Sequence, residues 1–213
     1  MNIFKESFSL LKNILAARQM IWQLVRQDFR NRCIGATLGF VWTFIQQLVM
    51  IIIFWFVFSI AFKASTVEGI PFISWFIAGI AAWNFFSEAL NLATNVFYEY
   101  SFLVKKVNFQ IVVLPIVKIF SSLIIHGIFL LIVFIVLFLT HVQFSIYFFQ
   151  VIYYTIALVI LLIGLSWITS SFCVFVKDVS YVVSILLQFG FWLTPIFWDV
   201  KMIPESLIPG KFL

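Results

Sequence analysis

Several apolar runs in this 213-residue chain are as long as a bilayer is thick, and their length constrains the fold more than any other feature. A hydrocarbon core of about 30 Å is crossed by about 20 helical residues. The run 40–62 has only four polar members, which are Thr43, Gln46, Gln47 and Ser59. Charged residues make up 10% of the chain, too few to cover the surface of a soluble domain. The sequence therefore predicts an integral membrane protein.

The breaks between the apolar runs define five candidate spans. They are 40–62, 72–97, 111–139, 145–175 and 179–198. Each run is continuous and much longer than the roughly ten residues of a barrel strand, so an all-α, polytopic helical bundle is predicted. We divide the chain into an N-terminal segment, 1–33, a transmembrane domain, 34–198, and a C-terminal stretch, 199–213.

Lysine and arginine are distributed unevenly between the two sides of this predicted bundle. Six of them precede the first span, and Lys105, Lys106 and Lys177 lie in the second and fourth connections. The opposite side carries only three lysines. The positive-inside rule therefore places the N-terminus of this multi-pass protein in the cytoplasm and the C-terminal stretch outside.

Residues 14–32 predict an amphipathic helix that lies in the cytoplasmic membrane interface. One helical face carries its apolar residues, Ile14, Ile21, Trp22, Val25 and Phe29. Trp22 is expected at headgroup depth, and the arginines of the polar face, Arg18, Arg26 and Arg30, are expected to face anionic lipid. Two interpretations remain open, namely a topology anchor and a docking surface for a cytoplasmic partner.

The second span carries a stripe of polar side chains on one helical face. Asn84, Glu88, Asn91 and Asn95 follow one another at spacings of four, three and four residues. A carboxylate at the bilayer centre costs about 3 kcal/mol or more, so this stripe must face protein or water. It is interpreted either as the wall of a hydrated path or a coupling element, or as hydrogen-bonding groups that hold the helices together.

Other chemistry is sparse in this sequence. Lys118 and His126 suggest a proton relay in the third span, but Lys118 lies near the cytoplasmic interface, and a single intramembrane His is typical of a satisfied hydrogen bond. The sequence has no Gly-x-x-x-x-Gly-Lys-Ser/Thr loop and only two His, so neither ATP nor a metal is expected to bind this chain. Any work must be powered by another subunit.

Several segments, taken in order, resemble the ABC-2-type permeases of ABC exporters that carry polysaccharides and polyol phosphates. They are IWQLVRQDFRNRCIGATLGFVWTFIQQLV from Ile21, AWNFFSEAL from Ala82, LVKKVNF from Leu103, FVKDVSYVV from Phe175, and LTPIFW from Leu193 followed by MIPE. Members of this family export lipid-linked O-antigen, capsule polysaccharide or teichoic acid. The resemblance extends from about residue 20 to about residue 207.

The resemblance implies a transport subunit and not an enzyme. Two copies would form a channel in the bacterial cytoplasmic membrane, and two separate ATPase subunits would use ATP and Mg²⁺. The N-terminal helix would be a gate-side helix. From position and charge alone, Arg30 and Arg32 are candidates for the anionic headgroup of the lipid-linked polysaccharide. Membrane lipid is an expected partner, and nucleic acid is not. The connection after the second span would dock into the ATPase through a coupling loop that includes Tyr98, Glu99, Phe102, Lys105, Lys106 and Asn108.

The sequence departs from the family pattern in three places. Gln47 and Gln110 stand where members have proline, so local kinks are expected to be weaker. Members also continue past an outer re-entrant segment, here 199–213, into a sixth span, whereas this sequence ends at Leu213 with five. A chain truncated there is expected to assemble poorly.

Three alternatives to polysaccharide export stay open. The first is an ABC-2 permease for a drug, small lipid or peptide. The second is a membrane transferase acting on lipid-linked sugars, for which Glu88 and Asp178 make a thin set of acids. The third is a non-transporting, truncated remnant or scaffold.

Overall fold

The computed structural model describes residues 17–33, 41–61, 72–101, 111–140, 146–196 and 198, and within these ranges every regular element is helical. The elements are α2 (Arg18–Cys33), α3 (Val41–Trp55), the π-helix η1 (Phe56–Ala61), α4 (Phe72–Thr94), α5 (Val96–Glu99), α7 (Val113–Leu139), the 3₁₀-helix η2 (Ile146–Phe149), α8 (Gln150–Phe175) and α9 (Val179–Leu193). The predicted all-α, polytopic membrane fold is confirmed. The C-terminal stretch 199–213 lies outside the described residues.

Three stretches of helix are long and apolar enough to cross a membrane, namely Phe72–Thr94, Val113–Leu139 and Ile146–Phe175. Their positions match the second, third and fourth predicted spans. Shorter apolar helices lie at Gln47–Phe58 and Val179–Leu193, inside the first and fifth predicted spans.

Helix α9 ends at Leu193, just before Pro195 and inside the predicted span 179–198. Thr194 precedes Pro195 and has an extended backbone, with φ −77° and ψ 133°. A residue before proline is pushed out of the helical region by the proline ring, and proline itself has no N–H to continue the ladder. Pro195 therefore accounts for the end of α9.

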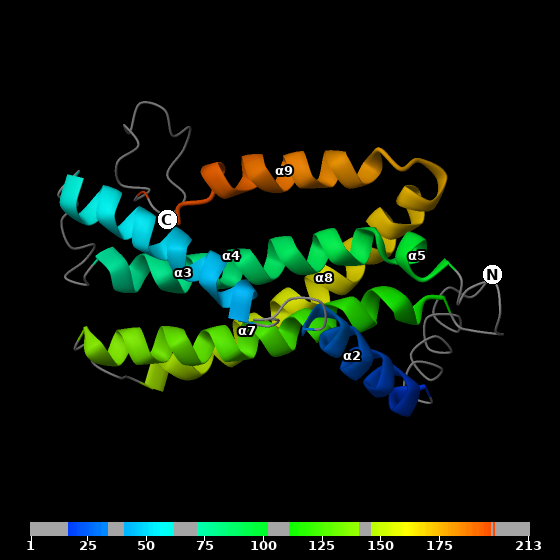
Figure 1. Ribbon diagram of the computed structural model, residues 1–213, viewed down its shortest axis with the longest axis horizontal. Helices are drawn as coiled ribbons and strands as arrows, with labels where there is room; N and C mark the ends of the chain where they lie inside the picture. Colours follow the sequence, from blue (N-terminus) through cyan, green and yellow to red (C-terminus); the bar gives the residue numbers. More distant parts are fainter. Residues whose placement is uncertain are drawn as a thin grey trace, which may run out of the picture.

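Helix α4 lies at the centre of the bundle and packs against α3, α7, α8 and α9 (Figure 1). Helix α7 runs antiparallel beside α4, and α2 crosses α7 near its N-terminal end. At the opposite end of this helix pair, the hydroxyl oxygens of Ser74 and Thr140 lie 2.8 Å apart. The contact between α4 and α7 therefore extends to this end of the helix pair.

Apolar packing holds the bundle along α4. One cluster centres on Phe76, Phe129 and Val133, and a second one on Ala89 and Leu162. In a bilayer, packing of this kind stabilises the bundle through van der Waals contacts between the helices, because lipid is as apolar as the side chains themselves. This packing joins α4 to both α7 and α8.

The outer surface of α8 is strongly apolar. Ile160 and Phe172 are 66% and 63% exposed, respectively. A continuous apolar surface of this kind is stable when lipid covers it.

Helix α9 approaches α4 closely at Gly190, where an added Cβ would lie 2.8 Å from a ring atom of Trp83. Glycine therefore permits the contact between α9 and α4.

The predicted amphipathic helix is present as α2, but its apolar face packs on protein. Val25 is 1% exposed and contacts Val113 and Val117 of α7. Trp22, which was expected on the same face, is 58% exposed. The helix is therefore docked against the bundle by Val25, and Trp22 points away from that contact.

Candidate functional site

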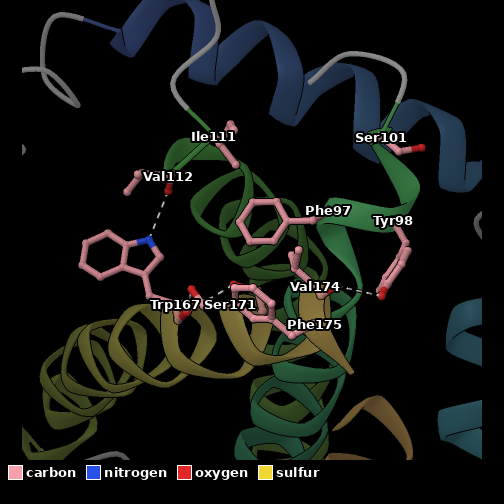
Figure 2. Close-up of a pocket in the computed structure, with 10 residues that line it drawn as sticks. Phe97, Tyr98, Ser101, Ile111, Val112, Trp167, Ser171, Val174 and Phe175 are labelled. Atoms are coloured by element: carbon pink, nitrogen blue, oxygen red, sulfur yellow. Dashed lines mark hydrogen bonds between the residues drawn. The ribbon is translucent and has the colours of Figure 1, made fainter. Parts of the chain in front are cut away.

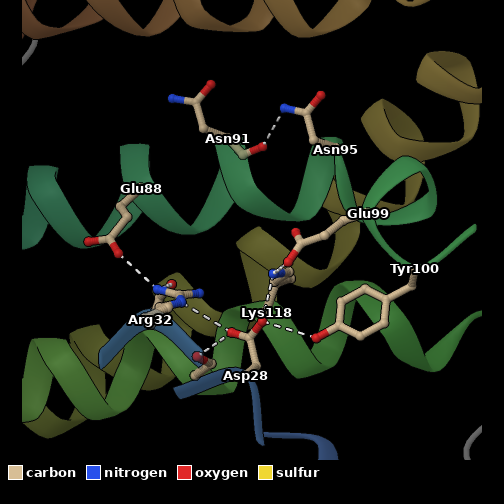
Figure 3. A network of polar contacts seen from close by, with 10 residues as sticks. Asp28, Arg32, Glu88, Asn91, Asn95, Glu99, Tyr100 and Lys118 are labelled. Atoms are coloured by element: carbon tan, nitrogen blue, oxygen red, sulfur yellow. Dashed lines mark hydrogen bonds and ion pairs between the residues drawn. The ribbon is translucent and has the colours of Figure 1, made fainter. Parts of the chain in front are cut away.

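Asp28 is a buried carboxylate on the face of α2 that packs against α7 (Figure 3). Its Oδ1 accepts hydrogen bonds from Lys118 Nζ at 2.6 Å and from the hydroxyl of Tyr100 at 3.1 Å. Its Oδ2 accepts a hydrogen bond from Ser121 Oγ at 2.6 Å. Only 3% of the Asp28 side chain is exposed, so these donors replace the water that an exposed carboxylate would bind.

Lys118 joins α2 to the segment that follows α4. Its side chain is 2% exposed, and Nζ donates both to Asp28 and to Glu99 Oε1 of α5, at 2.7 Å from the latter. The same ammonium lies 5.2 Å from the centre of the Tyr100 ring. A buried ammonium is stable only with such partners, because transfer from water costs several kcal/mol.

Arg32 connects α2 to α4. Its Nε donates to Asp28 Oδ2 at 3.1 Å, and its Nη1 donates to Glu88 Oε1 at 2.9 Å and to Ser122 Oγ at 3.3 Å. We call the set Asp28, Arg32, Glu88, Glu99 and Lys118 the charge cluster. It brings three carboxylates and two cations together from α2, α4, α5 and α7 (Figure 3).

The surroundings set the protonation states of two groups outside the spans. Burial alone would raise the pKa of Asp28, but hydrogen bonds from Lys118 and Ser121 and the charges of Lys118 and Arg32 outweigh it and lower the pKa below its ordinary value. Burial, together with the adjacent Asp28 carboxylate, raises the pKa of the Tyr100 hydroxyl. At neutral pH, Asp28 is therefore ionised and Tyr100 keeps the proton that it donates.

Acidification is expected to weaken the docking of α2. The ionised Asp28 contributes its full stability above the unfolded-state pKa of about 3.9, and this contribution is lost as the pH falls through the lower folded-state pKa. The thermal midpoint of the purified protein, compared with that of Asp28→Asn between pH 7 and pH 3, measures this effect. We expect the wild type to be more stable at pH 7 and the difference to narrow on acidification. A difference that does not change with pH would contradict this assignment.

The side chains of the predicted polar stripe form hydrogen bonds with different neighbours. Glu88 points to Arg32, whereas Asn91 Oδ1 accepts a hydrogen bond from Ser184 Oγ of α9 at 2.9 Å. Asn95 is exposed and donates to the backbone of its own helix at Asn91. The stripe thus provides interhelical hydrogen bonds, which is one of the two interpretations made from the sequence.

The stripe also lines an open hollow of about 320 Å³ between α3 and α4. Its lining residues are Gln47, Met50, Asn84, Ser87, Glu88 and Asn91. Gln47 Oε1 is buried and has no hydrogen-bond partner in the described part of the chain.

The first residues of the predicted coupling loop are bound to the bundle. The Tyr98 hydroxyl donates to the backbone carbonyl of Cys173 in α8 at 2.8 Å, and Lys177 Nζ lies 5.1 Å from the centre of the Tyr98 ring. Glu99 is held by Lys118. The other residues predicted for the coupling loop lie outside the described residues; they are Phe102, Lys105, Lys106 and Asn108.

A second cavity, of about 560 Å³, lies beside this segment (Figure 2). Phe97 and Tyr98 line one side, and Trp167 of α8 lines another. The Trp167 indole N–H donates to the backbone carbonyl of Val112 at 3.1 Å, which ties α8 to the start of α7. The surroundings of this cavity are mainly apolar.

The arginines predicted to face anionic lipid or the cargo headgroup do not share one environment. Arg26 and Arg30 are exposed on α2. Arg32 is instead bound by the carboxylates of Asp28 and Glu88, because it lies on the buried side of the helix. A lipid phosphate would have to compete with both carboxylates for Arg32, so Arg26 and Arg30 are better placed to bind a phosphate.

Lys118 and His126 have separate surroundings. Lys118 belongs to the charge cluster, whereas His126 stacks on Phe85 at 4.6 Å between ring centres and hydrogen-bonds to the backbone of Ala81. His126 Nδ1 is buried, with no hydrogen-bond partner within the described ranges. No group of three or more His, Cys, Asp or Glu in the described part of the chain is placed to hold a metal ion.

Comparison with known proteins identifies the family. Residues 19–209 match the family described as ABC-2 type transporter. An O-antigen export system permease protein RfbA from Myxococcus xanthus is 23% identical over 200 residues, which cover 92% of this chain and 75% of that protein. Two RfbA permeases of the same description from Klebsiella pneumoniae are each 24% identical over 188 residues, covering 86% of this chain and 70% of theirs. Together with the helical membrane fold, the match shows that this chain belongs to the ABC-2 type transporter family.

Proposed function

We propose that this chain is the membrane-spanning permease subunit of an ATP-driven exporter that moves lipid-linked polysaccharide across the bacterial cytoplasmic membrane. The family match and the relatives described as O-antigen export permeases support this cargo. The sequence has no P-loop, so ATP and Mg²⁺ would be bound by a separate ATPase subunit. Two copies of the chain would form the channel.

The observation that carries the transport mechanism is the charge cluster. Lys118 binds Glu99, one of the first residues of the predicted coupling loop, and it also binds Asp28 of α2. Movement of the loop by an ATPase would therefore act on α2 and on α7 together. Buried ion pairs suit this role, because separating either pair would leave a charge without a partner in a medium of low dielectric constant.

The exposed side of α2 would meet the membrane and the cargo at the cytoplasmic face. Trp22 is suited to headgroup depth, and Arg26 and Arg30 are suited to anionic lipid or to the headgroup of the lipid-linked polymer. The coupling residues Lys105 and Lys106 would provide a basic surface to the ATPase.

The proposal is tested by purifying the tagged, natively expressed chain in mild detergent and identifying its partners by mass spectrometry. We expect an ATPase with a Walker motif to copurify, and we expect deletion of the permease gene to remove a surface polysaccharide. A permease that copurifies with no ATPase would contradict the proposal. An ATPase partner with unchanged surface polymer would point to a drug or small-lipid cargo instead.

A further inference from the structure

Three buried polar atoms have no hydrogen-bond partner in the described part of the chain. They are Arg32 Nη2, Gln47 Oε1 and His126 Nδ1, and they come from α2, α3 and α7. A buried polar atom without a partner destabilises any protein interior, and bulk water cannot reach such an atom within a bilayer. Groups of this kind are usually bound by an ordered internal water molecule.

One small cavity lies among these three residues. It is enclosed by α3, α4 and α7, and we call it the inner cavity. Gln47 and His126 are part of its lining. Glu88 and Ser122 also line it, and Arg32 Nη1 donates a hydrogen bond to each of them. The three atoms without partners therefore belong to residues that either line the inner cavity or bind its lining.

The size of the inner cavity suits one water molecule. Its volume is about 10 Å³. A cavity needs about 10–15 Å³ to hold a water molecule. The space is too small for a sugar, a phosphate or a lipid chain, unlike the hollow of about 320 Å³ beside Asn91 and the cavity of about 560 Å³ beside Phe97.

The groups around the inner cavity match the hydrogen bonds that water forms. The Arg32 guanidinium is a donor, and the amide oxygen of Gln47 is an acceptor. His126 donates to the backbone carbonyl of Ala81, and because its Nδ1 has no partner, Nε2 is that donor and Nδ1 is an acceptor. A water molecule that accepts from Arg32 and donates to both acceptors forms three hydrogen bonds, the usual number for a buried water.

We propose that the inner cavity binds one water molecule, which joins Arg32 Nη2, Gln47 Oε1 and His126 Nδ1. An ion fits these groups less well, because a cation would lie beside the Arg32 guanidinium and an anion beside two acceptors and the Glu88 carboxylate. The water connects α3 to the charge cluster, so that α2, α3, α4 and α7 meet at one polar site. This site is a feature of the fold and depends neither on the cargo nor on an ATPase.

Magic-angle-spinning NMR of the full chain in lipid bilayers, with isotope-labelled histidine, tests the site directly. The sequence has only two histidines, so His141→Gln leaves the signals of His126 alone. We expect Nδ1 of His126 to be unprotonated and to receive magnetisation from water. The absence of this transfer would overturn the proposal.

A pair of valine variants locates the water. Ala81 lines the inner cavity, and Ala81→Val is expected to displace the water and abolish the transfer, because the added methyl groups need its space. Ala78→Val makes the same change at an exposed alanine of α4 and is expected to leave the transfer intact. Undiminished transfer in Ala81→Val, or equal losses in the two variants, would reject the inner cavity as the site.

Gln47→Met tests the water bridge by the direction of its effect and needs no cavity-filling variant. Methionine has nearly the length of glutamine but no amide. Loss of a hydrogen bond to water is expected to lower the ratio of folded to unfolded protein about fivefold, whereas removal of an acceptor that has no partner would raise this ratio.

Gln150→Met is the matched control for this variant. It makes the same change at the exposed start of α8 and is expected to alter the ratio by less than about twofold. Titration with sodium dodecyl sulfate measures both variants against the wild type. An unchanged or increased ratio in Gln47→Met would overturn the proposed water bridge.

Discussion

Lys118→Met is expected to lower the free energy of unfolding by about 3–5 kcal/mol, the usual cost of removing one partner from a buried ion pair. Methionine keeps the apolar stem of the side chain but removes the ammonium. Asp28, with 3% of its side chain exposed, then loses its closest cation, and Glu99 loses its link to α7. Titration of the purified protein with sodium dodecyl sulfate, followed by circular dichroism, measures the loss. Reduced recovery of monodisperse protein in size-exclusion chromatography would accompany it.

Lys177→Met is the matched control for this variant. Lys177 is exposed and contacts the Tyr98 ring, so its replacement is expected to change stability by about 1 kcal/mol or less. The double variant Lys118→Met with Asp28→Leu should recover part of the lost stability, because Asp28 no longer remains as a buried carboxylate without its lysine. Equal stability of Lys118→Met and Lys177→Met would show that the cluster does not hold the bundle together.

Reversing both exposed arginines, Arg26→Glu with Arg30→Glu, is expected to abolish export while leaving the protein inserted in the membrane. Each arginine near an anionic surface contributes about 1 kcal/mol of attraction, and each glutamate replaces that attraction with repulsion. Neither arginine belongs to the charge cluster, so folding should be retained. Immunoblotting of surface polysaccharide in a complemented permease-deletion strain measures export, and the membrane fraction reports insertion.

The control for this pair adds negative charge without removing the arginines. Gln19→Glu with Gln23→Glu alters two exposed residues of the same helix and should retain most of the export. Normal export by the double arginine variant would reject a headgroup role for this side of α2. A comparable loss in the glutamine variant would assign the effect to net charge alone.

The spans could be predicted from the sequence because the bilayer imposes a length and a composition on each crossing helix. The second predicted span begins at Phe72, as α4 does, and the third and fourth end at Leu139 and Phe175, as α7 and α8 do. Pro195 likewise marks in the sequence the place where α9 ends, because a residue before proline leaves the helical region. Length, composition and proline together therefore predict where these helices lie and where several of them end.

The charge cluster could not be derived in the same way, because its bonds join residues that are far apart in the chain. Lys118 and Asp28 are 90 residues apart, and Arg32 and Glu88 are 56 apart. One local signal was present and was missed. Asp28 follows Val25 by three residues and Ile21 by seven, which places a carboxylate on the apolar face of the helix. A charge in that position predicts a buried partner.

The pair formed by α4 and α7 is fastened near both of its ends. Ser74 and Thr140 meet at one end, while Glu88 and Lys118 are linked at the other through Arg32 and Asp28. Two helices joined in this way resist both sliding and separation, so they move as one rigid unit. A transport cycle that widens the subunit would then open the contacts between this pair and its neighbouring helices. The contact of α9 with α4 is one of these, and it includes a side-chain hydrogen bond from Ser184 to Asn91.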